Sequence, residues 1–360
     1  MKKLYNTVDK RVLKERISQS HEPRVTVSFY KYHRINNPPF FRDYLFSNWD
    51  ELGVLGRTYI ASEGINAQIS VPEAQFNAFR DHLYSIIFMD GIRLNIAVQS
   101  DPKAFYKLIV KLRKKIVADG IDDPSFNASN TGVHLKAEEF NELTSRPDTV
   151  LIDMRNHYES EVGHFEGALL PDADTFREEI SMVEDMLKGH ENKNIVMYCT
   201  GGIRCEKASA YLKHKGFPNV HQLEGGIIKY ARDVKAAGLE NRFKGVNFVF
   251  DERLAERISD DVIARCHQCG NPFDHHTNCV NEACHILFIQ CDSCKAKYNN
   301  CCSEECKHIY SLPIEEQRLL RRGQKPARNV FRKGRSEKLL FKTVGEKSMD
   351  NLRWKSELLE

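Results

Sequence analysis

The sequence contains no apolar run long enough to span a lipid bilayer, and its first residues lack the apolar core and small-residue cleavage site of a signal peptide. It also shows no fingerprint for a nicotinamide or flavin cofactor, no haem-attachment motif and no 2-His-1-carboxylate iron triad. We therefore expect a cytoplasmic protein without a membrane partner, and no flavin, haem or NAD cofactor is evident.

The chain has enough residues for two or three domains, because 360 residues exceed the usual size of a single one. Lysine and arginine (53) nearly balance aspartate and glutamate (50), so the positions of the charges say more than the net charge of +3. Nine of the eleven cysteines fall between Cys266 and Cys306. In a cytosolic chain such a cluster more often binds metal than forms disulfides.

A reactive cysteine is predicted where the apolar strand at 194–198 ends. Cys199 is followed by a glycine-containing turn, by Arg204 and by a predicted helix. Backbone N–H groups at a helix N-terminus, with positive charge beside them, lower a cysteine pKa and keep the thiolate nucleophilic. We expect the catalytic group to comprise Cys199, Thr200, Gly201, Gly202 and Arg204.

The spacing from Cys199 to Arg204 is C-x4-R, one residue shorter than the C-x5-R phosphate cradle of cysteine phosphatases. The loop should therefore prefer a group smaller than phosphate, and a persulfide sulfur would fit. Cys205 is either a resolving thiol or a side chain packed against the helix. A strand-terminal cysteine that is merely a small buried hydrophobe is the alternative for Cys199 itself.

The segment 150–155, the Gly-His-Phe-Glu-Gly-Ala segment at 163–168 and the Leu-Glu-Gly-Gly-Ile segment at 223–227 lie in the order found in the rhodanese superfamily, which this region resembles. The resemblance implies that Asp153 and Arg155 support the catalytic loop. Glu159 and His164 are candidates for proton shuttling or for a purely structural role.

Strands and helices alternate through this region, which predicts a parallel α/β domain over residues 132–240. Its strands are expected near Val150, Ala168, Ile195 and Val220. In such sheets, ligands bind at the carboxyl ends of the strands, where the catalytic loop would lie.

The chain before this domain reads as a lead-in over 1–21 and then a β-α-β-β-α-β pattern over 22–101. This order predicts a ferredoxin-like α+β domain. The last expected strand is Ile92 to Val98.

A connector over 102–131 alternates apolar and basic residues, the latter including Lys107, Lys111 and Arg113. These three side chains either face RNA or form a solvated strand face whose charges block edge pairing.

A linker is expected over 241–262, followed by a cysteine-rich zinc module over 263–312. Two C-x2-C pairs flank interleaved cysteines, a spacing typical of zinc ribbons and cross-braced modules. The preferred pairing places one zinc on Cys266, Cys269, Cys291 and Cys294. The second site would use Cys279, Cys284, Cys302 and Cys306, with His275, His276 or His285 as substitutes. An iron–sulfur cluster is the alternative.

Residues 313–360 are expected to form a flexible basic tail, because periodicity is lost from Arg318 onward and glycine and proline recur. Such an arm suits phosphate-backbone contact, although a solubilising tail without a partner is the alternative. The proposed RNA contacts there are Arg321, Arg322, Arg332 and Lys333.

This domain order, with Ala-Ser-Glu-Gly-Ile-Asn-Ala-Gln-Ile-Ser at 61–70, Gly-Ile-Asp-Asp-Pro at 120–124 and Cys-Cys-Ser-Glu-Glu-Cys at 301–306, resembles the rhodanese-domain tRNA uridine hydroxylases. The resemblance implies oxygen-dependent conversion of the wobble uridine, position 34 of tRNA, to 5-hydroxyuridine. It also implies molecular oxygen as co-substrate and the tRNA anticodon loop as partner. The alternatives are persulfide transfer by Cys199 for tRNA thiolation and a non-catalytic RNA-binding protein with a relic domain.

Overall fold

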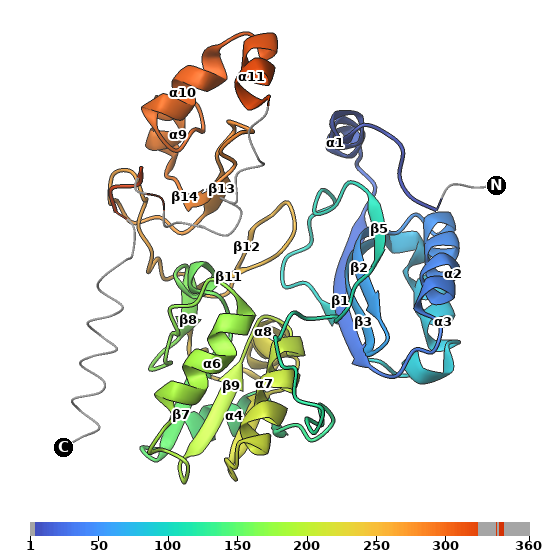
Figure 1. Cartoon of the computed structure of the whole chain (residues 1–360), viewed down its shortest axis with the longest axis vertical. Coiled ribbons are helices and arrows are strands. Elements are labelled where there is room, and N and C mark those ends of the chain that lie inside the picture. Colours follow the sequence, from blue (N-terminus) through green and yellow to red (C-terminus); the bar gives the residue numbers. More distant parts are fainter. Residues whose placement is uncertain (1–3, 323–335, 337, 342–360) are drawn as a thin grey trace.

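The computed structural model describes residues 4–322, 336 and 338–341. Figure 1 shows three parts: an N-terminal α+β domain, a central α/β domain and a small C-terminal module above the central domain. This arrangement confirms the expected fold class. No helix within the described residues is both long and apolar enough to cross a membrane.

The N-terminal domain is a five-stranded sheet with the order β4-β1-β3-β2-β5. Its strands are β1 (Arg24–Tyr32), β2 (Leu55–Ala61), β3 (Gly64–Pro72), β4 (Asn95–Ile96) and β5 (Leu108–Leu112). Its helices are α1 (Lys10–Gln19), α2 (Pro38–Glu51) and α3 (Phe76–Tyr84), with short 3-10 turns η1 (Glu73–Gln75) and η2 (Ile87–Met89). The order of the first four strands is that of a ferredoxin-like domain, as expected.

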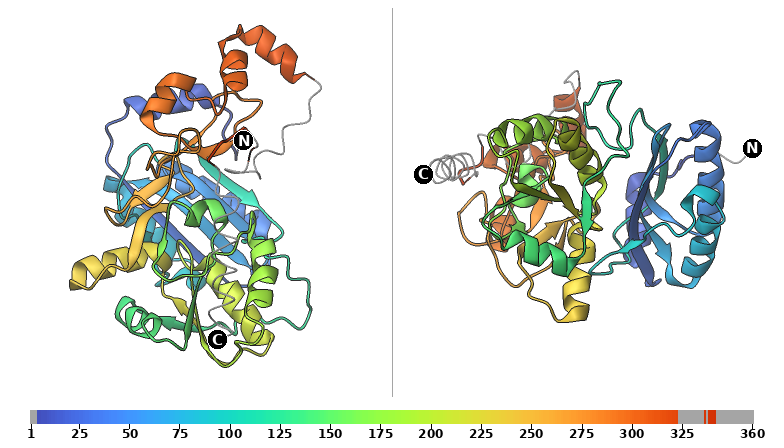
Figure 2. Two further views of the ribbon diagram at one scale, coloured as in Figure 1. Left: turned by 90° about the vertical axis from the view of Figure 1, so that its left-hand side faces the viewer. Right: turned by 90° about the horizontal axis from the view of Figure 1, so that it is seen from below.

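The two faces of this sheet differ because alternate residues of a strand point to opposite sides. One face carries apolar side chains that pack beneath α2 and α3, among them Val27, Phe29, Ile65, Ala67 and Ile69. The other face carries polar side chains and is turned toward the central domain (Figure 2, right). That orientation places the polar face opposite the catalytic loop.

Two expectations for this region were wrong. The strand expected from Ile92 to Val98 is only two residues long, and the domain continues past residue 101. β5, expected within the connector, pairs in parallel with β2 and forms the edge of the sheet. It joins the sheet because Leu108 and Val110 are buried in the domain core.

The central domain contains a four-stranded parallel sheet with the order β6-β10-β9-β7. Its strands are β6 (Val133–Leu135), β7 (Thr149–Asp153), β9 (Asn194–Tyr198) and β10 (Val220–Leu223). Its helices are α4 (Ala137–Thr144), α5 (His157–Ser160), α6 (Phe176–Met186), α7 (Ile203–His214) and α8 (Gly226–Ala237). Alternate residues of β9 enter two separate cores, one on each face of the sheet.

The strand expected near Ala168 and the linker expected over 241–262 both need correction. The first is reduced to a single bridge between Ile152 and Leu169. The second contains β11 (Phe243–Phe248) and β12 (Ala255–Arg257), and β11 pairs with β8 (Gly163–Phe165). This segment is part of the folded unit because its apolar strand residues are buried.

A buried lysine joins the first two domains. Lys207 of α7, only 3% exposed, places its Nζ 2.7 Å from Glu63 Oε2 and 2.9 Å from Asp119 Oδ2. Nearby, the Tyr30 hydroxyl of β1 donates to Glu206 Oε1 at 2.9 Å. These contacts hold the N-terminal sheet over helix α7. Separating the two domains would leave the buried charge of Lys207 without a partner, which is costly.

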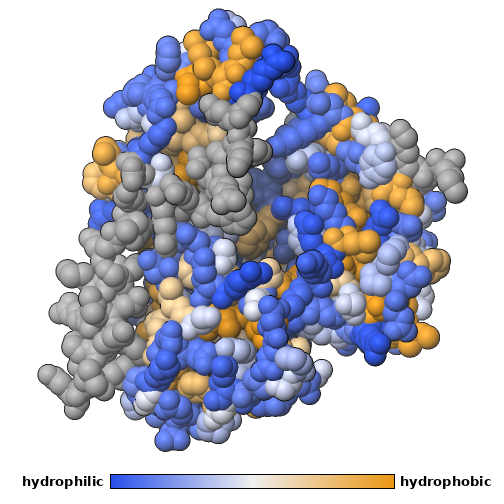
Figure 3. Space-filling model, in the orientation of Figure 1, coloured by the Kyte–Doolittle hydropathy of each residue, from blue (hydrophilic) through white to orange (hydrophobic). Residues whose placement is uncertain are grey.

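The C-terminal module contains β13 (His276–Asn278), β14 (Leu287–Ile289), α9 (Asp292–Tyr298), α10 (Glu304–Ser311) and α11 (Ile314–Arg321). The start of the expected flexible tail is therefore helical, with Arg318 pairing one turn back with Glu315 at 2.7 Å. Arg332 and Lys333 lie outside the described residues. Figure 3 shows hydrophobic side chains over α10 and α11, and a hollow where the three parts of the molecule meet.

Candidate functional site

The catalytic loop begins where β9 ends and closes at the first turn of α7. Cys199 follows the strand directly and is 1% exposed. Its Sγ accepts a hydrogen bond from the Gly202 backbone N–H at 3.1 Å. Gly202 has a φ of +101°, and a Cβ there would lie 2.7 Å from the Tyr30 hydroxyl. Only glycine allows this turn so close beneath the N-terminal sheet.

The loop stabilises Cys199 as a thiolate. Burial by itself raises the pKa of a thiol, but the Cys205 thiol, the Arg204 charge and the backbone N–H groups of both residues more than offset it. The pKa of Cys199 is lowered to about 5, so the sulfur is an anion at neutral pH. Burial and the neighbouring thiolate raise the pKa of Cys205, which remains a thiol and serves as a hydrogen-bond partner of Cys199.

Arg204 is held by Glu159 of α5. The guanidinium donates to both carboxylate oxygens of Glu159, at 2.7 and 2.9 Å, and to Thr200 Oγ1 at 3.4 Å. A bidentate pair of this kind fixes the orientation of arginine. His164 Nδ1 lies 2.9 Å from the Ser160 carbonyl oxygen, a structural contact. Glu159 was a candidate from the sequence, but its pairing with Arg204 was not predicted.

Asp153 and Arg155 form a second buried pair at the end of β7. Arg155 donates to both carboxylate oxygens of Asp153, at 2.8 and 2.6 Å, and to the Gly163 carbonyl at 2.6 Å. The Tyr198 hydroxyl donates to the same carboxylate at 2.8 Å. These contacts join β7, β8 and the end of β9.

A buried acid that the sequence did not single out lies behind the loop. Glu179 of α6 is 0% exposed, and neither of its carboxylate oxygens has a hydrogen-bond partner among the described residues. Burial raises the pKa of Glu179 well above its usual 4.5. The negative charges of Asp153, Glu159 and the Cys199 thiolate raise this pKa further, and the positive charge of Arg204 lowers it. We therefore treat Glu179 as a neutral carboxylic acid.

Replacing Glu179 with methionine is expected to stabilise the protein at pH 8 by about 1–3 kcal/mol, the cost of an unsatisfied buried polar group. A raised folded-state pKa means that this acid favours folding at low pH, and that the contribution is lost as pH rises above 4.5. The gain should therefore shrink toward pH 4.5. Thermal unfolding across this pH range measures it.

Glu179→Gln is the matched control, since it removes the titration but keeps a polar group of the same shape. It should flatten the pH dependence without the full gain in stability. A destabilised methionine variant with slower Cys199 alkylation would instead mean that Glu179 is ionised and supports Arg204.

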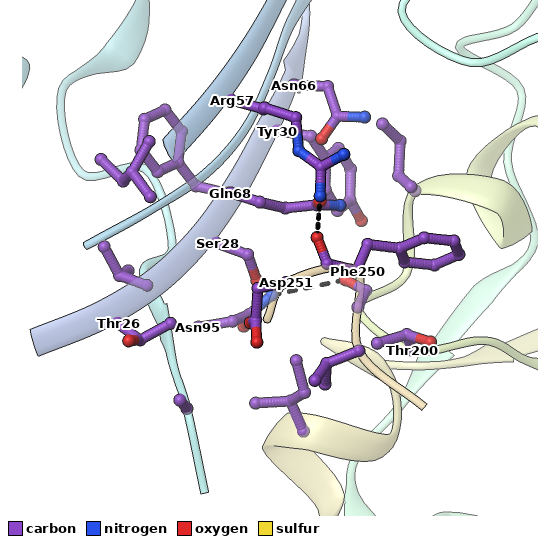
Figure 4. Close-up of a pocket in the computed structure, with 18 of the residues that line it drawn as sticks. Thr26, Ser28, Tyr30, Arg57, Asn66, Gln68, Asn95, Thr200, Phe250 and Asp251 are labelled. Carbon is purple, nitrogen blue, oxygen red and sulfur yellow. Dashed lines mark hydrogen bonds between the residues drawn. The ribbon is translucent and has the colours of Figure 1, made fainter. Parts of the chain in front are cut away.

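A cavity of about 330 Å³ separates the loop from the N-terminal sheet. Cys199, Thr200 and Gly201 line one side, and strands β1, β2 and β3 line the other. The segment around Phe250 and Asp251 closes a third side (Figure 4). Its size falls within the roughly 300–1,000 Å³ of small-ligand sites.

The basic residues proposed for RNA contact fall in two separate places. Lys107, Lys111 and Arg113 lie in or beside edge strand β5, the last with its guanidinium 4.9 Å from the centre of the Tyr59 ring. Arg321 ends α11 in the C-terminal module and pairs with Glu282, and Arg322 follows it. Figure 1 places these two groups in different parts of the molecule.

The cysteines of the C-terminal module gather into two groups of four. One contains Cys266, Cys269, Cys291 and Cys294, and the other Cys279, Cys284, Cys302 and Cys306. Within each group all sulfur atoms lie within 4.8 Å of one another, and each group could hold a metal ion. The expected pairing is therefore the one observed, and none of the three histidine substitutes belongs to either group.

Sulfur spacing within the groups suits a tetrahedral ion. Four sulfurs about 2.3 Å from a zinc ion would lie about 3.8 Å apart. The measured contacts from Cys269 to Cys291 and from Cys284 to Cys302 are both 3.6 Å. Cys301 is buried beside the second group but is not part of it.

Fold and site together define a protein with a rhodanese-like domain whose reactive-cysteine loop lies beneath the sheet of a ferredoxin-like domain. Family models agree: the UPF0176 acylphosphatase-like domain matches residues 24–116, the rhodanese-like domain 136–233 and the rhodanase C-terminal family 244–307. A solved rhodanese-like domain from Anabaena is 22% identical, covering 31% of this chain and 78% of that one with a TM-score of 0.25, too weak to support a conclusion about function.

Relatives over nearly the whole chain identify the family. A tRNA uridine(34) hydroxylase from Pectobacterium atrosepticum is 58% identical over 333 residues, spanning 92% of this chain and 94% of the relative. One from an Enterobacter species (strain 638) is 56% identical, spanning 92% of this chain and 95% of the relative. This chain belongs to the tRNA uridine(34) hydroxylase family.

Proposed function

We propose that this protein hydroxylates the wobble uridine of tRNA, at position 34, to 5-hydroxyuridine, with molecular oxygen as co-substrate. The observation that carries the proposal is the 58% identity to a tRNA uridine(34) hydroxylase across 92% of the chain. The loop geometry supports it, because a buried thiolate faces a cavity large enough for a small ligand.

Cys199 acts as the nucleophile in this proposal. Carbon C5 of uracil is a poor site for direct oxidation, but addition of a thiolate to C6 makes C5 electron-rich and enolate-like. That carbon can then attack an oxygen species, and loss of the C5 proton with departure of the thiolate restores the C5–C6 double bond. The backbone N–H groups of the loop that runs from Thr200 through Gly201 and Gly202 to Arg204, that of Gly202 at 3.1 Å among them, stabilise the anion when the sulfur leaves. Arg204 supplies positive charge and is held in place by Glu159.

The reaction consumes one molecule of oxygen and an external two-electron reductant of the thiol class, whose two thiols supply two electrons and two protons as they become a disulfide. One oxygen atom enters the nucleoside and the other leaves as water.

We further propose that each four-cysteine group binds a structural zinc ion. Zinc suits an all-thiolate tetrahedral set, and so small a module has too small an apolar core to fold without such a staple. Neither group lines the cavity at Cys199, which supports a structural role.

The anticodon loop of tRNA is the proposed partner. We assign phosphate contacts to Lys107, Lys111 and Arg113 of the β5 edge and to the basic residues of the C-terminal region, Arg321, Arg322, Arg332 and Lys333. Such contacts position the nucleic acid without reading its sequence. We assign the reaction to the cytoplasm, where tRNA is located and where cysteines stay reduced and available to bind metal.

Nucleoside mass spectrometry tests the proposed activity. Purified protein incubated with tRNA that lacks modification at position 34 should yield a uridine heavier by one oxygen atom, and isotopically labelled oxygen gas should place the label in the product. A uridine carrying sulfur would establish sulfur transfer by Cys199 instead. No change in any nucleoside would refute both activities.

A further inference from the structure

The polar face of the N-terminal sheet presents an ordered row of side chains to the cavity. Strand register places Ser28 of β1 opposite Gln68 of β3, and Gln68 opposite Arg57 of β2. Residues directly opposite one another in a sheet share a face. All three line the cavity, and Figure 4 shows them pointing from the strands into it, with Thr200 on the far side.

Two members of this row have unused hydrogen-bonding groups. Among the described residues, no hydrogen bond joins the Ser28 hydroxyl or the Gln68 carboxamide to another residue. The neighbouring row is different: the Tyr30 hydroxyl donates to Glu206, and the Asn66 amide donates to the Ile116 carbonyl at 3.2 Å. Ser28 and Gln68, together with Thr26 at the end of the row, are therefore polar groups of this face left for a ligand.

The charges around the cavity favour a neutral ligand. Arg204 is paired with Glu159, and Arg253 with two carboxylates. The Arg57 guanidinium donates to the Phe250 carbonyl. Carboxylates neutralise Arg204 and Arg253, and Arg57 alone has only a neutral partner, so the cavity lacks the several free positive charges of a phosphate site. Apolar side chains such as Phe105 and Ile228 complete the wall.

We propose that Ser28 and Gln68 bind the N3–O4 edge of a uracil base that is flipped out of the anticodon loop into this cavity. A carboxamide offers one donor and one acceptor side by side, which match O4 and N3–H of uracil. RNA-modifying enzymes reach a base by extruding it, and they read it through this edge. The inference rests on the proposed hydroxylation and names the residues that hold its substrate.

This binding mode also orients the base for reaction. In a pyrimidine ring, C6 lies directly across from N3. A base whose N3 edge contacts the sheet therefore places C6 on the side of the opposite wall, where Cys199 is located. The contact with the sheet brings C6 near the thiolate, and the sulfur then adds to C6 from one face of the ring.

The test uses the full-length protein and an anticodon stem-loop RNA. Gln68→Leu and Ser28→Ala should each lower kcat/KM by about 10- to 100-fold, the range expected for losing a base-edge contact. Gln75→Leu is the matched control, because Gln75 is an exposed amide of the same domain outside the cavity. Alkylation of Cys199 should keep its wild-type rate and pH dependence in all three variants, which a merely structural role for Gln68 would not predict.

A second substrate makes the test specific to the N3 edge. RNA with 3-methyluridine at the target position lacks the N3–H, so the wild-type protein should process it poorly. The methylated RNA and Gln68→Leu both disrupt the same hydrogen bond. When they are combined, the fold-loss in kcat/KM should therefore be smaller than the product of the two separate fold-losses. Ser28→Ala, which removes a single oxygen atom, keeps the test decisive if the leucine variant does not fold.

Two results would overturn the inference while the wild-type protein is active. One is that the separate losses in kcat/KM multiply fully in the combined experiment, and the other is that kcat/KM is unchanged in both Gln68→Leu and Ser28→Ala. Absence of product with the wild-type protein would overturn the proposed function, and this inference with it.

Discussion

The Cys199→Ser variant is expected to fold normally and to form 5-hydroxyuridine at least about 10³-fold more slowly than the wild-type protein, the scale of loss seen when a nucleophile is removed. Serine keeps the size of the side chain, but its hydroxyl does not ionise near neutral pH even with the help of the loop. Nucleoside analysis after incubation with tRNA measures the loss. A serine variant with full activity would remove Cys199 from the mechanism.

Cys205 provides the companion variants. Because its thiol helps to lower the pKa of Cys199, Cys205→Ala should raise that pKa above its wild-type value of about 5. The pH midpoint for alkylation of Cys199 should move upward accordingly. Cys205→Ser retains a hydrogen-bond donor and should keep the midpoint near its original position. If Cys205 were an obligatory resolving thiol, the serine variant would instead lose turnover while its midpoint stayed low.

The second large effect concerns metal. Removing zinc with a strong chelator should unfold the C-terminal module, because structural zinc contributes about 10–16 kcal/mol of binding free energy that is coupled to folding. Replacing Cys294 with serine should destabilise the part of the module around the first group. Metal analysis should find two zinc ions per chain in the wild-type protein and one in Cys294→Ser. Proteolysis of the region after residue 263 should report the loss of structure.

Cys301→Ser is the matched control for this experiment, since Cys301 is buried in the same module but belongs to neither group of four. It should retain both ions. A metal-free protein with an unchanged unfolding transition would refute the structural zinc sites. Iron with a visible absorption band would identify a cluster instead.

Local spacing explains what could be predicted from the sequence. The residues of the catalytic loop are consecutive, from Cys199 to Arg204. They join a strand to a helix through a glycine turn, so the local sequence is enough to predict the loop. The first cysteine group was predictable, because it combines two C-x2-C pairs, whereas the second was only the preferred pairing, since spacing alone does not determine it. Both features depend on residues close together in the chain or on ligand chemistry that constrains distant ones.

Features that depend on long-range packing were missed. The pairing of Arg204 with Glu159 joins residues 45 positions apart, and nothing in either local sequence marks it. Strand β5 was assigned to a connector because its alternation also suits a solvated edge. Polar and apolar residues alternate in β1, but a polar face that lines a cavity has the same pattern as one that meets water.

Helix α11 was missed for a different reason. The tail was predicted from the basic residues that begin at Arg318, and the acidic residues just before them were overlooked. Glu315 and Glu316 lie in the first turn of α11 and arginines in its last turn, which is the charge order that the helix dipole favours. The sequence signal was present there, at the boundary of the expected tail.

The order of the sequence has a consequence for how the reactive thiolate is made. The sheet that covers Cys199 is complete at Leu112, whereas the cysteine follows 87 residues later. Domains fold largely as they emerge from the ribosome, the N-terminal one first. The cover can therefore exist before the cysteine is synthesised, so that a newly made thiolate would enter a sheltered position and be protected from cellular oxidants from the outset.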